Sequence, residues 1–256
     1  MKFLPIVPTG NLSLLDEFDG LFVLPNSIRD KRFFDYIVQR SWNLVVIDND
    51  YYEAGQCCNF ESECKIAKLL DAQEVYCIGP ETLDGLQTLE LCKPYKDSEL
   101  LMVILKPVTY DVKTTQELMQ GMVELFGKYC DLFPNWCLIS KCTEHEREQV
   151  IKDVPTAIIQ WHDIRTELAK QIRHDAEFIH CLGCDSIDEL AELHYTGVDS
   201  CDSSFPCSRA AFFTSMKAGA KSSRILLEHH YDRLAETRMR NALQAVKQIL
   251  SLTGGD

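Results

Sequence analysis

The sequence predicts an α/β protein folded as a (β/α)8 TIM-type barrel. Short apolar, β-branched runs recur along the chain, and amphipathic segments separate them, which is the alternation of parallel β/α units. The chain has 256 residues, a length at which one closed barrel is routinely complete. No linker rich in Pro, Gly or Ser interrupts it, so residues 1–256 are expected to form a single domain.

Nine segments have the composition of buried parallel strands, one more than an eight-stranded barrel holds. The segment 74–79 lies between loop-rich stretches, so we predict that it belongs to a small insertion of about residues 51–98, after the third strand and beside the barrel. The nine segments are 2–8, 20–25, 43–48, 74–79, 100–106, 136–140, 156–160, 178–183 and 197–201.

Amphipathic patterns between the later strands predict the helices. Ser186 followed by Glu189 gives the last of these the start of a capping box. Leu243, Val246 and Leu250 recur at helical spacing and predict a long C-terminal helix. The expected helices span 113–129, 144–153, 163–174, 186–195 and 222–252.

The composition indicates a globular cytoplasmic protein. No run approaches the roughly 18 apolar residues of a membrane span, and the first residues lack the pattern of a signal peptide. The twelve cysteines are therefore expected to be reduced. Cys181 and Cys184 form a single CxxC pair without a second pair, so we expect strand-end packing there and no metal site.

Charge is distributed unevenly along the chain. The net charge of −13 is unfavourable for a general nucleic-acid binder, which needs a basic surface. Residues 206–256 are the exception, because they hold eight Lys or Arg residues against four acidic ones. Two interpretations remain open for this basic segment, a solvated helix face and a patch that faces phosphates.

Active sites of such barrels form just beyond the C-terminal ends of the strands. Two carboxylates from strands far apart in sequence could converge there as a nucleophile and an acid/base pair. Structural explanations remain open for several candidates: capping of the next helix by Asp50 or Asp163, backbone bonding by Asp199, core packing of His162, and simple exposure of Lys141. The candidates are Asp48, Asp50, Lys106, Lys141, His162, Asp163, Asp199 and Asp202.

The segment 178–206, FIHCLGCDSIDELAELHYTGVDSCDSSFP, resembles the part of tRNA-guanine transglycosylases that runs from MGxG through a helix to GxDxFDxxxP. The resemblance implies that Asp202 is the nucleophile. The run NLVVIDND is similar to the strand that carries the second catalytic aspartate, which corresponds to Asp48, or to Asp50 if the register slips. The matching residues are Leu182, Gly183, Gly197, Val198, Asp199, Asp202 and Pro206.

The resemblance implies a pentosyltransferase that exchanges bases without a cofactor. Asp202 attacks C1′ of a nucleotide, the base leaves, and a 7-deazaguanine displaces the covalent intermediate. Two carboxylates suit this chemistry, since one acts as nucleophile and the other moves protons on the two bases.

Departures from the family pattern affect the zinc site and the base pocket. No cysteine follows Cys207, so the family's zinc motif is missing. Lys106 stands where the family has a base-reading Asp after the fourth strand, and Lys141 stands where it has a Gln after the fifth. Trp161 and His162 replace paired glycines after the sixth strand, and these four residues are expected to bind the base.

A compact chain without the zinc motif resembles the bacteriophage branch of the family, which places 7-deazaguanines into DNA. The expected partner is therefore single-stranded or unstacked DNA rather than tRNA, because C1′ is inaccessible within a duplex. The expected phosphate contacts are Arg209, Lys217, Lys221 and Arg224, which follow the Asp202 motif.

Two other functions stay open. A nucleosidase or glycosylase would keep both aspartates and let water replace the incoming base, which suits an acidic surface. A barrel without catalytic activity could act as a binding or accessory subunit, and a homodimer is also compatible with the sequence.

Overall fold

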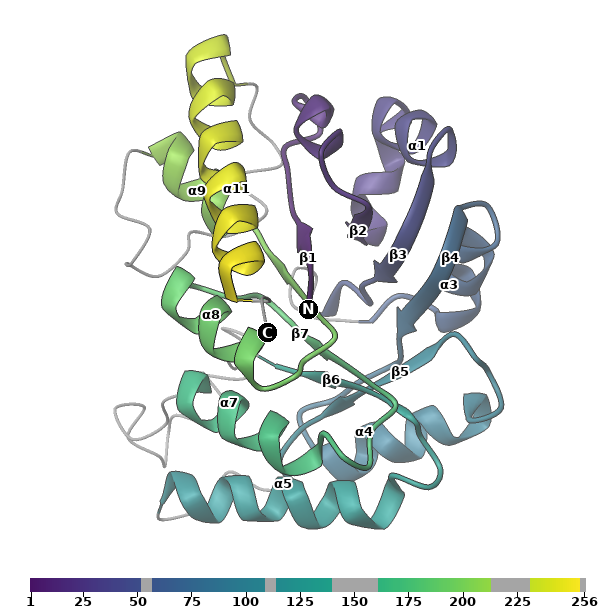
Figure 1. Cartoon of the computed structure of the whole chain (residues 1–256). Helices are drawn as coiled ribbons and strands as arrows, with labels where there is room; N and C mark the ends of the chain where they lie inside the picture. The colour runs from purple at the N-terminus through teal and green to yellow at the C-terminus, as the bar shows by residue number, and fades with distance from the viewer. Residues whose placement is uncertain (52–56, 109–113, 140–160, 213–230, 254–256) are drawn as a thin grey trace.

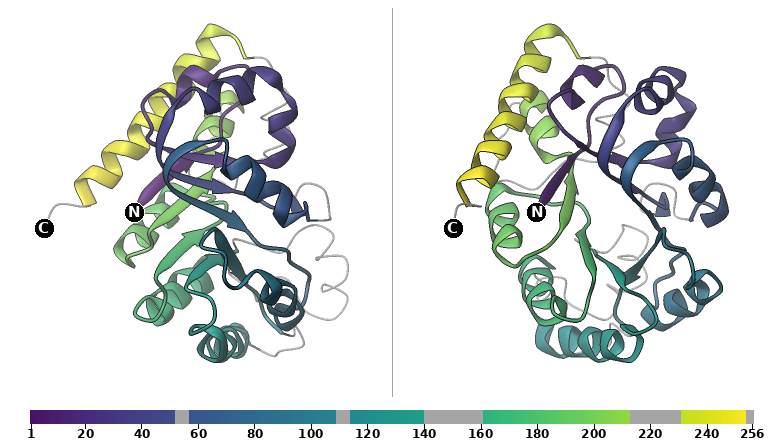
Figure 2. Two further views of the ribbon diagram at one scale, coloured as in Figure 1. Left: turned by 90° about the vertical axis from the view of Figure 1, so that its right-hand side faces the viewer. Right: turned by 45° about the vertical axis from the view of Figure 1, so that its right-hand side comes forward.

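The computed structural model describes residues 1–51, 57–108, 114–139, 161–212 and 231–253, and it contains an eight-stranded parallel barrel with an outer ring of helices (Figures 1 and 2). The hydrogen-bonded order is β1-β8-β7-β6-β5-β4-β3-β2. The predicted (β/α)8 fold is therefore confirmed. The strands are β1 (Lys2–Pro5), β2 (Gly20–Val23), β3 (Ser41–Ile47), β4 (Asp71–Ile78), β5 (Leu101–Leu105), β6 (Asn135–Leu138), β7 (Phe178–Cys181) and β8 (Ser200–Ser203).

Apart from the first half of β4 and the start of β3, the strands are mostly buried on both faces, which explains their continuous apolar runs. On β3, Leu44 and Val46 belong to the core inside the barrel, whereas Val45 and Ile47 belong to the core between strands and helices. The helices that form the outer layer are α1 (Lys31–Val38), α3 (Phe60–Ala67), α4 (Gly85–Cys92), α5 (Thr115–Tyr129), α7 (Trp161–Ile172), α8 (Ile187–Tyr195) and α9 (Phe205–Phe212).

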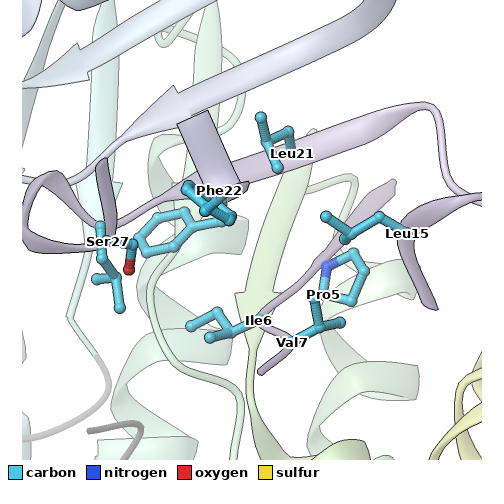
Figure 3. Close-up of a pocket in the computed structure, with 9 residues that line it drawn as sticks. Pro5, Ile6, Val7, Leu15, Leu21, Phe22 and Ser27 are labelled. Atoms are coloured by element: carbon cyan, nitrogen blue, oxygen red, sulfur yellow. The ribbon is translucent and has the colours of Figure 1, made fainter. Parts of the chain in front are cut away.

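The barrel is nearly closed, and its seam lies between β1 and β2, the two ends of the hydrogen-bonded order. A Cβ atom at Gly20 would lie 2.3 Å from Leu4 Cδ2, so the glycine allows β2 to approach β1 closely. A small apolar pocket opens at this seam (Figure 3), and its lining includes Ile6, Leu21 and Phe22. Side-chain packing thus takes the place of a β-ladder at the seam.

The run 74–79 lies in the barrel, as part of β4, which pairs with β3 and β5. The prediction of an insertion at about 51–98 beside the barrel was therefore wrong for this run. The physical reason is that the first half of β4 is polar and partly exposed, so its apolar run is shorter than those of its neighbours. The ninth candidate, 156–160, and the expected helix 144–153 lie outside the described residues.

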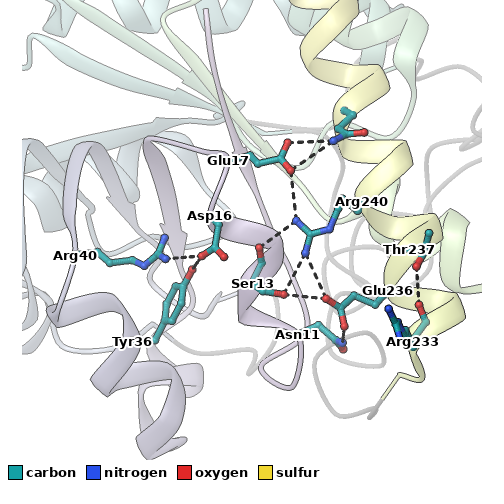
Figure 4. A network of polar contacts seen from close by, with 11 residues as sticks. Asn11, Ser13, Asp16, Glu17, Tyr36, Arg40, Arg233, Glu236, Thr237 and Arg240 are labelled. Carbon is teal, nitrogen blue, oxygen red and sulfur yellow. Dashed lines mark hydrogen bonds and ion pairs between the residues drawn. The ribbon is translucent and has the colours of Figure 1, made fainter.

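The C-terminal helix α11 (Arg233–Thr253) packs along the barrel beside α8 and α9 (Figure 1). Figure 4 shows how polar contacts attach it to the segment that contains the short 3-10 helix η1 (Leu12–Leu15). Arg240 pairs with Glu17 and Glu236, and Glu236 accepts hydrogen bonds from Ser13 and Asn11. The expected helix 222–252 is confirmed from residue 233 onwards. No helix in the described part of the chain is both long and apolar enough to span a membrane.

Candidate active site

Three charged side chains continue the inward-facing rows of their strands at the C-terminal end of the barrel. Asp48 follows Leu44 and Val46 of β3, and Lys106 follows the inward-facing residues of β5. Asp202 lies on β8 itself. All three are buried, with exposed fractions of 7% for Asp48, 1% for Lys106 and 2% for Asp202. The sequence thus places catalytic-type groups where barrel enzymes carry their active sites.

The Asp202 carboxylate is held through one of its two oxygens. Its Oδ1 accepts a hydrogen bond from Gly183 N at 3.0 Å and lies 3.1 Å from His180 Nε2. No donor among the residues that the structure describes reaches Oδ2. Gly183 has a φ of +58°, a left-handed conformation that favours glycine. One oxygen is therefore held by these contacts, and the other has no such contact among the described residues.

His180 lies directly beneath Asp202 and is fully buried. Its Nδ1 atom lies 2.8 Å from Ser200 Oγ, and its ring stacks on Phe22 with 5.8 Å between centroids. The sequence analysis did not select this histidine. The period of two along β7 was the available signal, because Phe178 and His180 share the face that Asp202 presents on the neighbouring strand.

A buried ion pair holds the turn between β7 and α8. The Arg165 guanidinium contacts both the Leu182 carbonyl and the Glu189 carboxylate. Glu189 Oε2 also accepts a hydrogen bond from Asp185 N at 2.8 Å. The predicted capping box is thus half confirmed, because Ser186 Oγ accepts from Glu189 N while the Glu189 side chain binds this turn instead. These contacts keep the Gly183 amide in place.

Asp48 and Asp50 lie in different surroundings. Asp50 has a φ of +58°, and its Oδ2 accepts hydrogen bonds from Asn26 N at 3.0 Å and from the Cys58 thiol at 3.5 Å. Burial raises the pKa of this carboxyl. Asp48 instead follows the inward row of β3, so it is the aspartate of this loop that faces the barrel interior.

The Cys137 thiol lies in the core inside the barrel, and nearby carboxylates affect its pKa. Complete burial raises its pKa well above the ordinary value, and the charges of Cys181, Asp202, Asp48 and Glu81 raise it further. Coulombic effects fall with distance, so these three carboxylates are near enough to act on a thiol inside the barrel. The convergence of Asp48 and Asp202 as a nucleophile and an acid/base pair stays a prediction.

Lys106 belongs to a buried polar group that the sequence analysis recognised only in part. Its ammonium pairs with Glu81, lies 3.0 Å from the Thr82 carbonyl oxygen and stands 4.7 Å from the centre of the Tyr51 ring. Asn49 Nδ2 donates to Glu81 Oε1 at 3.0 Å. Because β4 is a barrel strand, Lys106 follows the fifth strand rather than the fourth, and Glu81 follows the fourth. A correct strand count would have identified Glu81.

The remaining candidates have different positions. Asp199 is structural, since its Oδ2 accepts from Ile179 N at 2.7 Å and pairs with Arg173 at 2.6 Å, which confirms its backbone-bonding alternative. Arg209 lies on α9 and is only 5% exposed, so its guanidinium is not on an open phosphate-binding surface. Trp161, His162 and Asp163 are the first three residues of α7. Lys141, Lys217, Lys221 and Arg224 lie outside the described residues.

The CxxC pair takes part in core packing. Cys181 and Cys184 are both buried, and burial together with the neighbouring Cys184 thiol raises the pKa of Cys201 well above its ordinary value. Within the described ranges, no group of three or more His, Cys, Asp or Glu side chains is arranged to hold a metal ion. Low zinc content stays a prediction, which metal analysis of protein purified without chelator tests at less than about 0.2 zinc per chain.

The comparisons with known protein families and curated sequences found no match.

Glu63 is a buried acid in the layer of helices outside the barrel. It lies on α3, is 1% exposed, and neither carboxylate oxygen has a hydrogen-bond partner among the described residues. Burial, and to a smaller extent the charge of Asp50, raises its pKa from 4.5 to about 9. Glu63 is therefore protonated in the folded protein at neutral pH.

The raised pKa of Glu63 predicts a stability that falls as pH rises. Between the ordinary pKa of 4.5 and the folded value of about 9, the folded state binds a proton that the unfolded state has lost. The free energy of unfolding should therefore decrease by up to about 1.4 kcal/mol per pH unit in this window because of Glu63. In urea unfolding at pH 5, 7 and 8, Glu63→Gln should gain stability relative to the wild type as pH rises.

The matched control is Glu61→Gln, which removes an exposed carboxylate from the same helix. Its stability should follow the wild-type curve at all three pH values. Parallel curves for Glu63→Gln and the wild type would contradict the assignment of a raised pKa.

Proposed function

We propose that the chain is a base-exchange transglycosylase that replaces guanine in a nucleic acid with a 7-deazaguanine. The observation that carries the proposal is the state of Asp202, a carboxylate held at Oδ1 by the Gly183 N–H group and by His180 Nε2 and left without a donor on Oδ2 among the described residues. A nucleophile of this kind forms an ester with C1′ of the sugar as the bond from C1′ to the base breaks. Its position matches the aspartate that the transglycosylase resemblance selects.

Asp48 is the proposed acid/base. Its carboxyl group follows β3, on the other side of the seam from Asp202, and the charges of both aspartates raise the pKa of the Cys137 thiol. In the first half-reaction it gives a proton to the departing guanine, and in the second it takes a proton from the arriving base. The two aspartates then have separate roles, so the acid/base is regenerated in each cycle.

The buried group around Lys106 is the proposed base-reading site. Glu81 supplies carboxylate oxygens that suit N–H groups of a purine, and Lys106 supplies N–H donors that suit its carbonyl oxygen. With β4 counted as the fourth strand, an acidic residue, Glu81, follows that strand after Gly79 and Pro80, in keeping with the family's acidic residue after its fourth strand. This agreement supports the proposal, and Lys106 then takes the place expected for the glutamine. Lys141, Trp161 and His162 remain proposed members of the base site.

The contacts of α11 favour a nucleosidase as the second candidate. Arg240 and Lys247 bind Glu17 or its carbonyl group, so these basic residues hold the helix in place instead of presenting charge to a strand. The chain is acidic overall, and these basic side chains are engaged in contacts within the protein. A small nucleoside, which carries no phosphate, therefore suits it as a substrate. Water would then release the sugar from Asp202.

One experiment separates the two candidates. Purified protein is incubated with single-stranded DNA, tRNA or free guanosine and deoxyguanosine, each with labelled guanine in the base position. We expect labelled guanine to leave single-stranded DNA only when a 7-deazaguanine is supplied, and mass spectrometry should find the new base in the strand. Release of guanine from nucleosides without an added base would support the nucleosidase instead, and no release from any substrate would contradict both.

Strand binding is expected to depend steeply on salt. If Lys217, Lys221 and Arg224 contact phosphates, alanine at all three positions should flatten the plot of log affinity against log salt by roughly 0.7 per lost contact. Fluorescence anisotropy with a single-stranded oligonucleotide measures this slope. As a control, Lys128→Ala with Lys170→Ala removes exposed charges from α5 and α7 and should leave the slope unchanged. Equal slopes for both variants would mean that the oligonucleotide contacts other residues.

A further inference from the structure

We propose that His180 is a positioning residue, which holds Asp202 through Nε2–H and leaves Oδ2 as the attacking atom. The inference rests on the proposed function and adds to it a part of the site that the family resemblance does not mention. It starts from a chain of contacts across β7 and β8, from Ser200 through His180 to Asp202.

The three residues are brought together by the parallel ladder. His180 pairs in register with Ser200, and Asp202 lies two residues further along the same face of β8. The imidazole therefore spans from Ser200 Oγ, at 2.8 Å, to Asp202 Oδ1, at 3.1 Å. Both distances are set by rigid strands rather than by a loop.

The surroundings fix the ring as well as its position. His180 has no exposed surface, and the parallel stacking on Phe22, with an interplanar angle of 10°, prevents rotation out of the plane of the contacts. A substrate at the mouth meets Asp202 first, because His180 lies one layer deeper. His180 therefore acts through Asp202 and does not touch the substrate.

The chain of contacts also selects a tautomer. An ionised carboxylate accepts hydrogen bonds only, so the proton of His180 must be on Nε2 when Asp202 is ready to attack. Nδ1 then accepts a hydrogen bond from the Ser200 hydroxyl. This arrangement leaves Oδ1 with two donors, Nε2–H and the Gly183 amide, while Oδ2 keeps its lone pairs for C1′.

Two amide variants test the geometry. In His180→Gln the side-chain nitrogen can reach the place of Nε2, whereas in His180→Asn the shorter side chain reaches only the place of Nδ1. With single-stranded DNA, we expect His180→Asn to slow formation of the covalent enzyme–DNA adduct by roughly 10²-fold, as a displaced reacting group does. His180→Gln should stay within about threefold of the wild type, with KM unchanged in both variants.

An equal loss in both amide variants, or a rise in KM without a slower adduct step, would overturn the positioning role. Thermal unfolding of each variant identifies a folding defect. If His180→Asn does not fold, Ser200→Ala takes its place, because it removes only the hydrogen bond to Nδ1 and leaves the imidazole itself present. Ser200→Ala should slow adduct formation by less than His180→Asn would, and an unchanged rate would count against the proposal.

A spectroscopic measurement separates this inference from the proposed function. In protein labelled with ¹⁵N-histidine, His180→Gln assigns the His180 signals among those of the seven histidines. We expect the Nε2–H form in the wild type and a changed Nε2 signal in Asp202→Ala. A protein that exchanges no base but shows this pattern would contradict the proposed function alone, whereas an Nδ1–H form would contradict the His180 inference.

Discussion

The Asp202→Asn variant is expected to lose base exchange by roughly 10⁴-fold or more, as enzymes do when a covalent nucleophile is removed. The amide cannot form the ester with C1′. Its oxygen can still accept the hydrogen bonds of Gly183 and His180, so the wild-type fold should remain. The measurement is the rate of guanine release from single-stranded DNA, with circular dichroism and thermal unfolding as the checks of folding.

Asp199→Asn is the matched control, because it makes the same change three residues earlier in the same motif. Asp199 bonds Arg173 and the Ile179 amide, so this variant should lose stability, by about 1–3 kcal/mol, and keep the chemical step. Near-normal turnover in Asp202→Asn would exclude Asp202 as the nucleophile. A loss of chemistry in folded Asp199→Asn would show that the two aspartates have been assigned in the wrong order.

The second large effect is expected at Asp48. Asp48→Asn should slow the chemical step by roughly 10²–10⁴-fold, the usual contribution of general acid/base catalysis. Single-turnover release of guanine measures this step directly. A leaving group that needs no protonation should restore much of the rate, because the amide fails only in proton transfer.

Asp50→Asn supplies the comparison for Asp48. Asn is among the residues that best tolerate a positive φ, and its oxygen can still accept the hydrogen bond of Asn26 N. Its turnover should therefore stay close to the wild type. Equal, mild effects of the two substitutions would mean that neither aspartate moves protons in the reaction.

Much of the fold could be predicted because parallel strands buried on both faces leave continuous apolar runs. β4 was misplaced, since Asp71, Gln73 and Glu74 interrupt its first half where the strand is partly exposed. That single error gave the next two strands, β5 and β6, numbers that were one too low. It assigned Lys106 to the wrong strand and hid Glu81, although both residues follow strands in the printed sequence.

The candidate site was predictable where a residue follows its strand directly, as Asp48 does. His180 was missed because a histidine in an apolar run has the same pattern whether it packs in the core or contacts a carboxylate. Glu63 could not be identified from sequence, since its raised pKa depends on how α3 packs near Asp50. Such properties come from contacts between distant segments, which local patterns do not encode.

The pairing of β1 has a consequence for synthesis on the ribosome. In the part of the chain that the structure describes, β1 forms its ladder with β8 alone, so the first strand lacks this partner until residues 200–203 have been made. At about 5–20 residues per second, an apolar strand at the start of the chain waits roughly 10–40 s for its partner. During that time its unpaired edge is a template for another chain. Chaperone demand during translation should therefore concentrate on the first residues of the nascent chain.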